Sequence, residues 1–292
     1  MMVMSSAVCF SAKAVFAKLA YRHGADASTV LTLRMLFAVP FFALAGYLAG
    51  QPATAQPFTR REKLTLLALG SVGYYFASLF DFLGLKFVTA GLERLILFLY
   101  PTLVILMNAI WHRERITART GQALLLSYGG VGLVVWSDRL SGGSNVALGS
   151  TLVFLGALAY AFYLAFSQPL LVRHGSMRIT SHVLVISSCC VFTQFAVEAD
   201  FARLAQPWQV IALCAATGLV ATVIPAFLLA AGMQRLGASR ASLIGTVGPV
   251  STLLLAYLVL DEPLTPIQLV GSLLVLLGVW MVSARSLVKA AS

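Results

Sequence analysis

Tyrosine, serine and threonine residues occur inside long apolar segments of this 292-residue chain. If these segments are membrane-spanning helices, the residues lie at mid-membrane depth. Such hydroxyl groups could replace the water around a polar solute, which is binding chemistry and requires no reactive group. Tyrosine offers an apolar ring with a polar tip, whereas anchoring tyrosines usually lie at the membrane surface. Any one hydroxyl could instead bond to its own helix, but the set favours a cavity. The predicted substrate-binding residues are Tyr74, Tyr75, Ser78, Tyr100, Tyr160, Tyr163, Thr222 and Thr246.

Charged residues inside the apolar segments form a second group, expected in the outer half of the membrane. Charges at such depth usually pair, and the corresponding positions in the second half of the chain are uncharged. The group is either an external gate or a static brace near the lipid headgroups, and the residues alone do not decide between the two. The predicted gate or ion-pair network is Lys18, Arg34, Asp81, Glu93 and Arg94.

Residues for ion coupling or catalysis are sparse. Lys13 is the one charge expected nearer mid-membrane, and no acidic residue or histidine is expected there. A facilitated mechanism is therefore favoured over proton coupling, although carbonyl groups at broken helices could still hold sodium. The chain lacks the HExxH, phosphate-loop and nucleophile-elbow motifs, and its four cysteines lack metal-site spacing. We expect no enzyme activity, no catalytic residue, no metal site and no cofactor.

Three prolines are expected to interrupt transmembrane helices: Pro101, Pro225 and Pro249. Proline removes a backbone donor, and in lipid a freed carbonyl must be satisfied by protein or by a water-lined cavity. Interruptions at corresponding positions of two halves are typical of a central transport site. The alternative is that these prolines only shape helix packing.

The composition is that of a membrane protein, with 60% hydrophobic and 10% charged residues, against about 25% charged residues in soluble proteins. A helix needs about 20 apolar residues to cross a bilayer. The ten predicted crossings are roughly 3–21, 28–50, 63–84, 89–111, 119–137, 147–171, 180–199, 208–234, 238–260 and 265–285. The first is interpreted as a retained helix, because it has no basic leader region and Lys13 interrupts it.

The net charge of +10 is explained by topology and not by nucleic-acid binding. With the N-terminus in the cytoplasm, the cytoplasmic loops and tail hold twelve Lys and Arg residues and the external loops hold four. Positive residues stay on the cytoplasmic side during insertion. Both termini are therefore predicted to be cytoplasmic.

The apolar pattern occurs twice along the chain. With an offset of 148 residues, Gly84, Pro101 and Glu114 fall on Gly232, Pro249 and Glu262. Each half has five predicted crossings, and because five is odd the second half enters the membrane from the opposite side. The predicted fold is all-α, with ten transmembrane helices as two inverted five-helix repeats, residues 1–140 and 141–292.

Several short motifs resemble the EamA family of the drug/metabolite transporter superfamily. They are Phe16-Ala17-Lys18-Leu19-Ala20, Leu31-Thr32-Leu33-Arg34-Met35, Ala238 through Pro249, and Leu260-Asp261-Glu262-Pro263-Leu264-Thr265 with Gly271 and Gly278; Ala90 through Pro101 and Arg113-Glu114-Arg115-Ile116-Thr117 repeat the latter part in the first half. The resemblance covers essentially the whole chain. One departure is Phe10-Ser11, where the family commonly has a tryptophan-glycine pair, and it weakens any substrate assignment taken from the family.

The resemblance implies a ten-helix inner-membrane carrier, usually an exporter, with a central cavity between helices 1, 3, 4, 6, 8 and 9. The aromatic residues match exporters of aromatic and other hydrophobic amino acids best. Alternatives are export of drugs, nucleosides or sugars, or a membrane scaffold that transports nothing. The expected partners are a small-molecule substrate and the lipid bilayer, with no nucleic acid, and the protein is expected to be a monomer or a homodimer.

Overall fold

A computed structural model describes residues 1–50, 57–112, 117–140, 145–198, 201–236 and 247–291. These residues form helices joined by short connections, with no strand in the described ranges. The elements are α1 (Met2–Arg22), α2 (Ala27–Gly50), α3 (Arg60–Ala68), η1 (Leu69–Phe76), α4 (Ala77–Gly84), α5 (Ala90–Leu97), α6 (Tyr100–His112), α7 (Ala118–Leu140), α8 (Val146–His174), α9 (Ser176–Glu198), η2 (Phe201–Leu204), α10 (Trp208–Gly218), η3 (Leu219–Val223), α11 (Ile224–Leu236), α13 (Val247–Leu260) and α14 (Pro266–Ala291).

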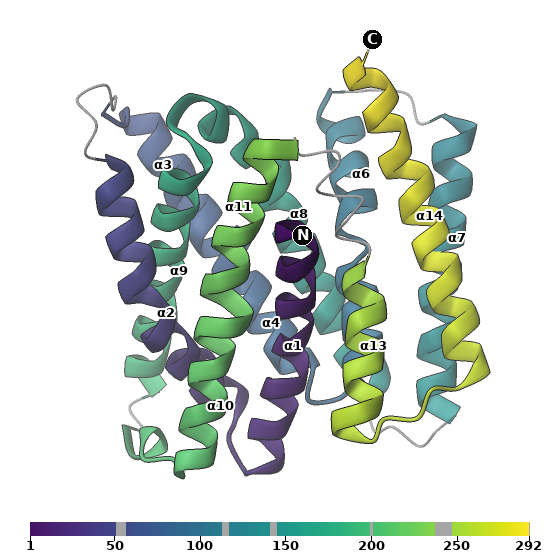
Figure 1. Cartoon of the computed structure of the whole chain (residues 1–292), viewed down its shortest axis with the longest axis horizontal. Coiled ribbons are helices and arrows are strands. Elements are labelled where there is room, and N and C mark those ends of the chain that lie inside the picture. Colours follow the sequence, from purple (N-terminus) through teal and green to yellow (C-terminus); the bar gives the residue numbers. More distant parts are fainter. Residues whose placement is uncertain (51–56, 113–116, 141–144, 199–200, 237–246, 292) are drawn as a thin grey trace.

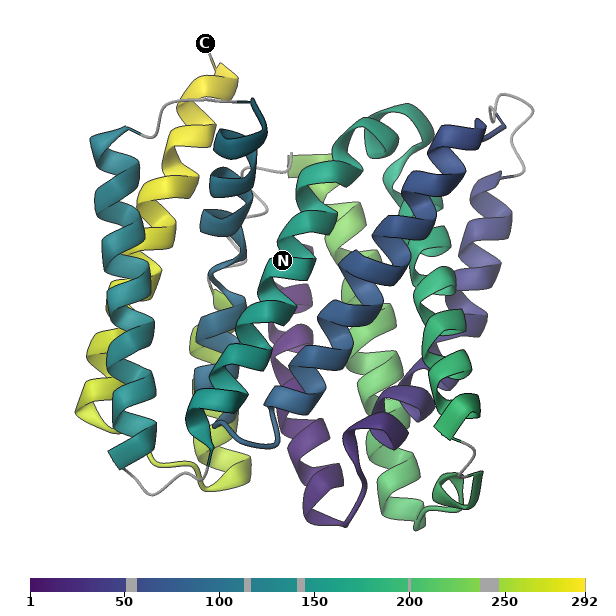
Figure 2. The same ribbon diagram turned by 180° about the vertical axis from the view of Figure 1, so that it is seen from behind.

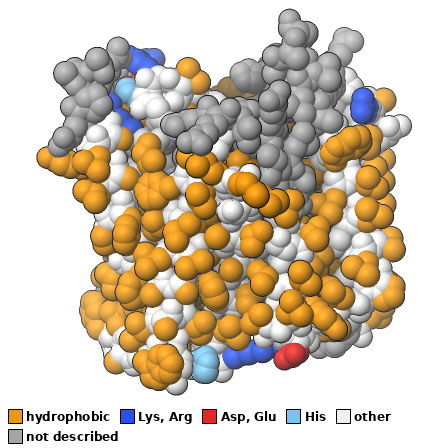
Figure 3. Space-filling model, in the orientation of Figure 1, with side chains coloured by type: hydrophobic (Ala, Val, Ile, Leu, Met, Phe, Trp, Pro, Cys, Tyr) orange, Lys and Arg blue, Asp and Glu red, His pale blue; other side chains and the backbone are white. Residues whose placement is uncertain are grey.

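Within the described ranges, seven helical spans are long and apolar enough to cross a membrane. They are carried by α1, α2, α3–η1–α4, α5–α6, α8, α9 and α10–η3–α11, while α13 and the described part of α14 are shorter apolar helices. Hydrophobic side chains cover the face drawn in Figure 3, and the visible charged side chains lie along its two ends. The prediction of an all-helical, multi-pass membrane protein is confirmed. The predicted crossing at 119–137 corresponds to α7, which is not among the seven.

Three of the spans are composite. In two of them a π-helical stretch, η1 or η3, separates two α-helices, and α5 is separated from α6 by Phe98 and Leu99. A π-helical turn inserts an extra residue into the hydrogen-bond ladder and often occurs at functional sites. With the offset of 148, η1 corresponds to residues 217–224, which include all of η3. The two π-helical stretches therefore occupy matching places in the two halves of the sequence.

Helix α1 lies in the middle of the molecule and packs on helices from both halves. It contacts α2 and α5 of the first half, and α10, α11 and α13 of the second half. Helices α7 and α14 pair along one side, and α2 pairs with α9 on the opposite side (Figures 1 and 2). Polar residues of α1 are consequently placed where the two halves meet.

Candidate functional site

Four of the predicted tyrosines lie together where η1, α6 and α8 meet. The ring centroid of Tyr160 is 6.0 Å from that of Tyr74, 5.6 Å from Tyr100 and 5.9 Å from Tyr163. These separations are those of favourable edge-to-face and stacked pairs. In the part of the chain that the structure describes, the hydroxyls of Tyr74, Tyr100 and Tyr160 have no hydrogen-bond partner. We call these four residues the tyrosine cluster. The Tyr163 hydroxyl lies 3.5 Å from Thr180 Oγ1, and the other three hydroxyls are free to bind a solute.

Gly73 allows η1 to approach α8 closely enough to form the cluster. A Cβ atom at Gly73 would lie 2.6 Å from Tyr163 Cβ and 3.1 Å from Tyr163 Cα. Any side chain at position 73 would push the two helices apart. The glycine therefore allows Tyr74, the next residue, to come within 5.2 Å of the Tyr163 ring, centroid to centroid.

Arg94 on α5 is a partly buried cation close to the tyrosine cluster. Its Nε is buried without a hydrogen-bond partner, and none of the described acidic groups forms an ion pair with it within 4.0 Å. A Cβ at Gly248 would lie 2.7 Å from Nη2, so the guanidinium lies against the backbone of α13. Its charge is near enough to act on Tyr100 and Tyr160. An unpaired guanidinium beside aromatic hydroxyls is suited to binding a carboxylate.

The other predicted binding residues have different surroundings. The Tyr75 hydroxyl donates to Gln194 Oε1 on α9 at 2.8 Å and does not join the cluster. Ser78 is buried on α4. Thr222 donates to the Thr217 carbonyl at 2.8 Å and accepts from Arg34 Nε at 3.0 Å, so its hydroxyl is already occupied. Thr246 lies outside the described residues.

Of the three predicted helix breaks, Pro101 falls in the first turn of α6, where a backbone N–H has no helical partner and proline is tolerated. Pro225 follows directly on the π-helical stretch η3 at the start of α11, and Pro249 lies on α13, whose described residues begin at Val247. Two serines of α1 bond to the adjacent backbone: Ser6 Oγ donates to the Pro225 carbonyl and Ser11 Oγ to the Gly248 carbonyl, both at 2.8 Å. The breaks are thereby linked to α1.

The structure divides the predicted charged network into separate parts. Asp81 and Glu93 are held together by Lys13, which the sequence analysis had left outside the network. Arg34 instead bonds to Thr222, and its guanidinium lies 5.2 Å from the Phe82 ring centroid. Lys18 pairs with Glu262, 244 residues away in the sequence. The similar depth of these charged residues in the membrane was not enough to predict which of them pair.

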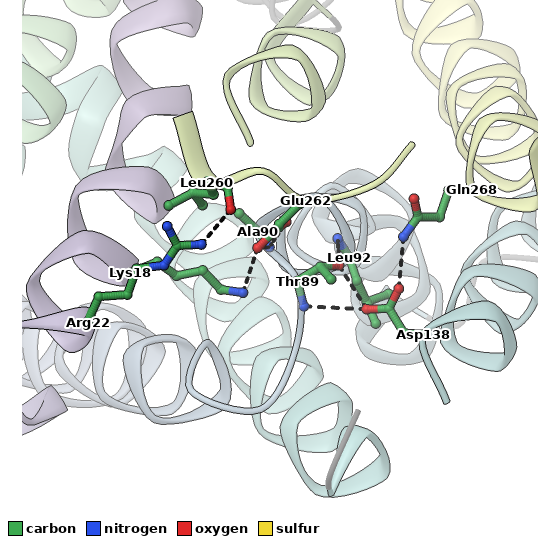
Figure 4. A network of polar contacts seen from close by, with 9 residues as sticks. All are labelled: Lys18, Arg22, Thr89, Ala90, Leu92, Asp138, Leu260, Glu262 and Gln268. Atoms are coloured by element: carbon green, nitrogen blue, oxygen red, sulfur yellow. Dashed lines mark hydrogen bonds and ion pairs between the residues drawn. The ribbon is translucent and has the colours of Figure 1, made fainter. Parts of the chain in front are cut away.

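Glu262 and Lys18 belong to a polar layer at the end of the bundle where α5 begins (Figure 4). Glu262 Oε1 lies 2.6 Å from Lys18 Nζ, and its two oxygens accept from the Ala90 amide at 3.1 and 2.9 Å. Arg22 donates to the Leu260 carbonyl. A carboxylate at a helix N-terminus is favoured by the helix dipole. The layer fastens α1 and α5 to the α13–α14 connection.

The same layer continues to α7 and α14. Asp138 accepts from Thr89 Oγ1 at 2.8 Å and from Gln268 Nε2 at 2.9 Å, and Thr89 caps the first turn of α5 by accepting from the Leu92 amide. Residues from both halves of the sequence therefore meet at this end, as Figure 4 shows. We refer to Lys18, Glu262, Thr89, Asp138 and Gln268 as the end layer.

Replacing Glu262 with alanine is expected to free the first turn of α5. The Ala90 amide and Lys18 would both lose their acceptor, and hydrogen bonds to charged groups contribute about 1.5–3 kcal/mol. Amide hydrogen exchange in residues 90–97 should become at least roughly tenfold faster, because local opening free energy sets the exchange rate. Glu198→Ala, at an exposed carboxylate, is the control. Unchanged exchange in α5 would show that Glu262 does not hold this helix.

The opposite end of the bundle has its own contact between helices. Glu62, in the first turn of α3, lies 3.0 Å from both Arg173 Nη1 and His174 Nε2 at the end of α8. Thr59 and Glu62 also form a capping box that begins α3. Phe58 packs on the rings of His174 and His182. The two ends are thus fastened by different groups.

Sequence reasoning missed several residues that bind across the bundle: Ser6, Ser11, Lys13, Asp138, Glu262 and Gln268. Glu262 carried a signal, since it repeats Glu114 at the offset of 148, but nothing pointed to Lys18 as its partner. The serines were indistinguishable from other small residues of α1. All four cysteines are free thiols.

Comparisons with known proteins agree with this description. The sequence model described as "EamA-like transporter family" matches residues 1–136 and again 147–284. The chain is 29% identical over 270 residues to the "Uncharacterized transporter YcbK" of Bacillus subtilis (strain 168), covering 90% of this chain and 86% of the relative. It is 24% identical to the "Uncharacterized inner membrane transporter YicL" of Salmonella typhimurium, covering 97% and 94%. One crystal structure, 18% identical, has the same fold, with a TM-score of 0.63 over 100% of this chain and 97% of that chain.

Proposed function

Since this chain belongs to the EamA-like transporter family, we propose that it exports small organic metabolites, most favourably aromatic or other hydrophobic amino acids, across the inner membrane by alternating access. That it is a membrane transporter follows from the family and its relatives; the substrate class and the direction are proposals. The observation that carries the substrate is the tyrosine cluster beside the unpaired Arg94. The name of the relative YicL supports the inner membrane as the location.

We propose ten crossings in two inverted repeats, residues 1–140 and 141–292, with both termini in the cytoplasm. The two ranges matched by the family model fall within these units. The matching positions of η1 and η3 support the same division. The twelve-to-four distribution of basic residues supports the orientation. With this orientation the end layer faces the exterior and Glu62 faces the cytoplasm.

An amino acid would satisfy both parts of the site. Its carboxylate would pair with Arg94, which has no ion pair among the described residues, and its apolar side chain would pack on the rings of Tyr74, Tyr100 and Tyr160. Edge-to-face contacts of this kind contribute about 0.5–1.5 kcal/mol each. A sugar or nucleoside would use the rings and hydroxyls but would leave Arg94 without a counter-charge. This difference is why amino acids are favoured over drugs, nucleosides and sugars.

We propose that the charged residues Lys18, Arg34, Asp81, Glu93 and Arg94 act around an external gate whose closing contact is Lys18–Glu262. This contact joins the first half of the chain to the second, which is what a gate between two repeats requires. A static brace would hold the same residues together without ever opening. Glu262→Ala should therefore change the rate of solute exchange per folded molecule if it is a gate, whereas a brace would change stability alone.

The proposed function is tested by counterflow in proteoliposomes. Vesicles are preloaded with unlabelled phenylalanine, diluted, and given labelled phenylalanine outside; leucine, threonine, a nucleoside and a sugar are preloaded in turn. Transient accumulation of label with an amino acid, and not in protein-free vesicles, is the expected result. No accumulation with any amino acid would reject this substrate class. No accumulation with any solute would favour the scaffold.

Tyr160→Leu is expected to raise the half-saturating concentration for counterflow roughly tenfold. The change removes a ring that contacts three neighbouring tyrosines, and the loss of about 1.4 kcal/mol of binding corresponds to a factor of ten. Tyr257→Leu is the matched control, because Tyr257 is exposed on α13. Equal affinities for the two variants would remove the tyrosine cluster from the binding site.

A further inference from the structure

Lys13, Asp81 and Glu93 form a buried charged trio at the junction of α1, α4 and α5. Lys13 Nζ lies 2.9 Å from Glu93 Oε1 and closer still to Asp81 Oδ2. The Lys13 and Asp81 side chains are 12% and 7% exposed, and Glu93 is not exposed at all. Asp81 is near the end of the span Arg60–Gly84 and Glu93 near the start of Ala90–Trp111. The trio therefore lies inside the bundle, toward the end-layer side.

One ammonium group is shared by two carboxyl groups. Asp81 Oδ2 and Glu93 Oε1 both lie beside Lys13 Nζ, and an ionised carboxylate has no hydrogen with which to bond to the other. Two of their oxygens, Asp81 Oδ1 and Glu93 Oε2, accept no hydrogen bond within the described part of the chain. Two adjacent carboxylates in a site of low dielectric repel each other, and one of them takes up a proton.

Other charged and titratable groups surround the trio but do not replace this proton. Arg34 on α2 bonds to Thr222, and Arg94 on α5 lies against Gly248. Tyr21 on α1 donates its hydroxyl to the Phe82 carbonyl at 2.9 Å, and the buried Cys214 belongs to α10. Neither arginine comes within 4.0 Å of a described carboxylate. Their charges favour keeping one carboxyl group ionised, which leaves the other to carry the proton.

We propose that Asp81 and Glu93, with Lys13, form a proton-binding site that couples solute export to inward proton movement. The proposal rests on the transport function proposed above and adds its energy source. A proton entering from the end-layer side would bind to the carboxyl pair, and it would later leave to the cytoplasm as a proton. No other bond forms or breaks.

The geometry gives the proton a way to act on the solute. Protonation neutralises a carboxylate that holds Lys13, so it weakens the attachment of α1 to α4 and α5. Through Ser6 and Ser11, α1 also bonds to the helix breaks near Pro225 and Pro249, and Glu93 precedes Arg94 on α5. Proton binding and solute binding would therefore bias the same helix contacts, and such coupling is reciprocal.

The sequence favoured a facilitated mechanism because the carboxylates were expected in the outer half of the membrane and none was expected at mid-depth. A carboxylate at the surface stays hydrated and ionised, whereas Glu93 is removed from water by α1, α8 and α13 packing on α5. The burial of the pair, and not its depth along the helix, is what makes proton binding a property of this site.

Proton binding can be tested without any substrate. Purified wild-type protein and the Glu93→Gln variant are titrated in unbuffered detergent solution between mildly alkaline and mildly acidic pH. The wild type should take up one proton more than the variant, and Asp81→Asn should behave as Glu93→Gln does. Glu198→Gln, at an exposed carboxylate, shows the contribution of an ordinary group. Infrared difference spectra of the wild type at the two pH values should show a protonated carboxyl band. Absence of both the extra proton and the band would overturn the proposal, whether or not the variants fold.

Coupling is tested in proteoliposomes that enclose a pH-sensitive dye. With phenylalanine loaded inside, the wild type should acidify the interior as phenylalanine leaves. Glu93→Gln should lose at least nine-tenths of the acidification measured per phenylalanine that leaves. Acidification at the wild-type rate in Glu93→Gln, or phenylalanine exit without acidification in the wild type, would contradict proton coupling. Failure of wild-type counterflow would instead contradict the proposed substrate.

Discussion

The Lys13→Met variant is expected to lose about 3–5 kcal/mol of free energy of unfolding, because removing one partner of a buried ion pair leaves the other partner uncompensated. Here two carboxyl groups, Asp81 and Glu93, would lose the same cation. Methionine fills a similar volume, so the effect would come from charge and not from a cavity. Denaturant or thermal unfolding in detergent micelles measures the loss.

Lys63→Met is the control for this variant, because Lys63 is exposed near the start of α3. Adding Asp81→Asn and Glu93→Gln to Lys13→Met should recover much of the lost stability, since a neutral trio leaves no buried charge. The loss should also shrink at acidic pH, where the carboxyl groups bind protons. If Lys13→Met were as stable as Lys63→Met, the ion pairs of Lys13 with Asp81 and Glu93 would not contribute to the free energy of unfolding.

The tyrosine cluster shows how far the sequence could predict the candidate site. Hydropathy predicts the helices, and the position of each tyrosine along its helix predicts a similar depth in the membrane for Tyr74, Tyr100, Tyr160 and Tyr163. In the structure these four rings lie together. Tyr75 follows Tyr74 and was expected beside it. Adjacent residues on a helix point in different directions, and in the π-helical η1 their directions change again, so Tyr75 bonds to Gln194.

The partners in the ion pairs could not be predicted from the sequence for a different reason. Lys18 and Glu262 are far apart in the chain, and only the packing of α1 on α13 makes them neighbours. Lys13 was excluded because its backbone lies nearer mid-helix than Asp81 or Glu93. A lysine side chain is long and flexible and can extend its ammonium along the helix. The sign of a charge and its depth along the helix limit which residues could join a buried network. Which of these residues pair with each other is determined by the tertiary structure.

The Gly130→Ala variant is expected to lower stability and the Gly129→Ala variant is not, although they alter neighbouring residues of α7. A Cβ at Gly130 would lie 2.5 Å from the Gly271 carbonyl oxygen and 2.9 Å from Val275 Cγ2 on α14. Backbone cannot move aside as a flexible side chain can. Overpacking of this kind costs about 1–3 kcal/mol, so Gly130→Ala should lower the free energy of unfolding by that amount.

Gly129 gives a matched control, because a Cβ there would meet nothing within 4 Å. Alanine at that position should be neutral or should stabilise α7 by up to about 1 kcal/mol, since glycine is the poorer helix former. Unfolding measured for both variants in the same detergent compares close approach directly with helix propensity. Gly271→Ala should reproduce the loss, because its Cβ would lie 2.7 Å from the Gly130 carbonyl oxygen. Equal stability of the Gly129 and Gly130 variants would contradict the close approach of α7 and α14.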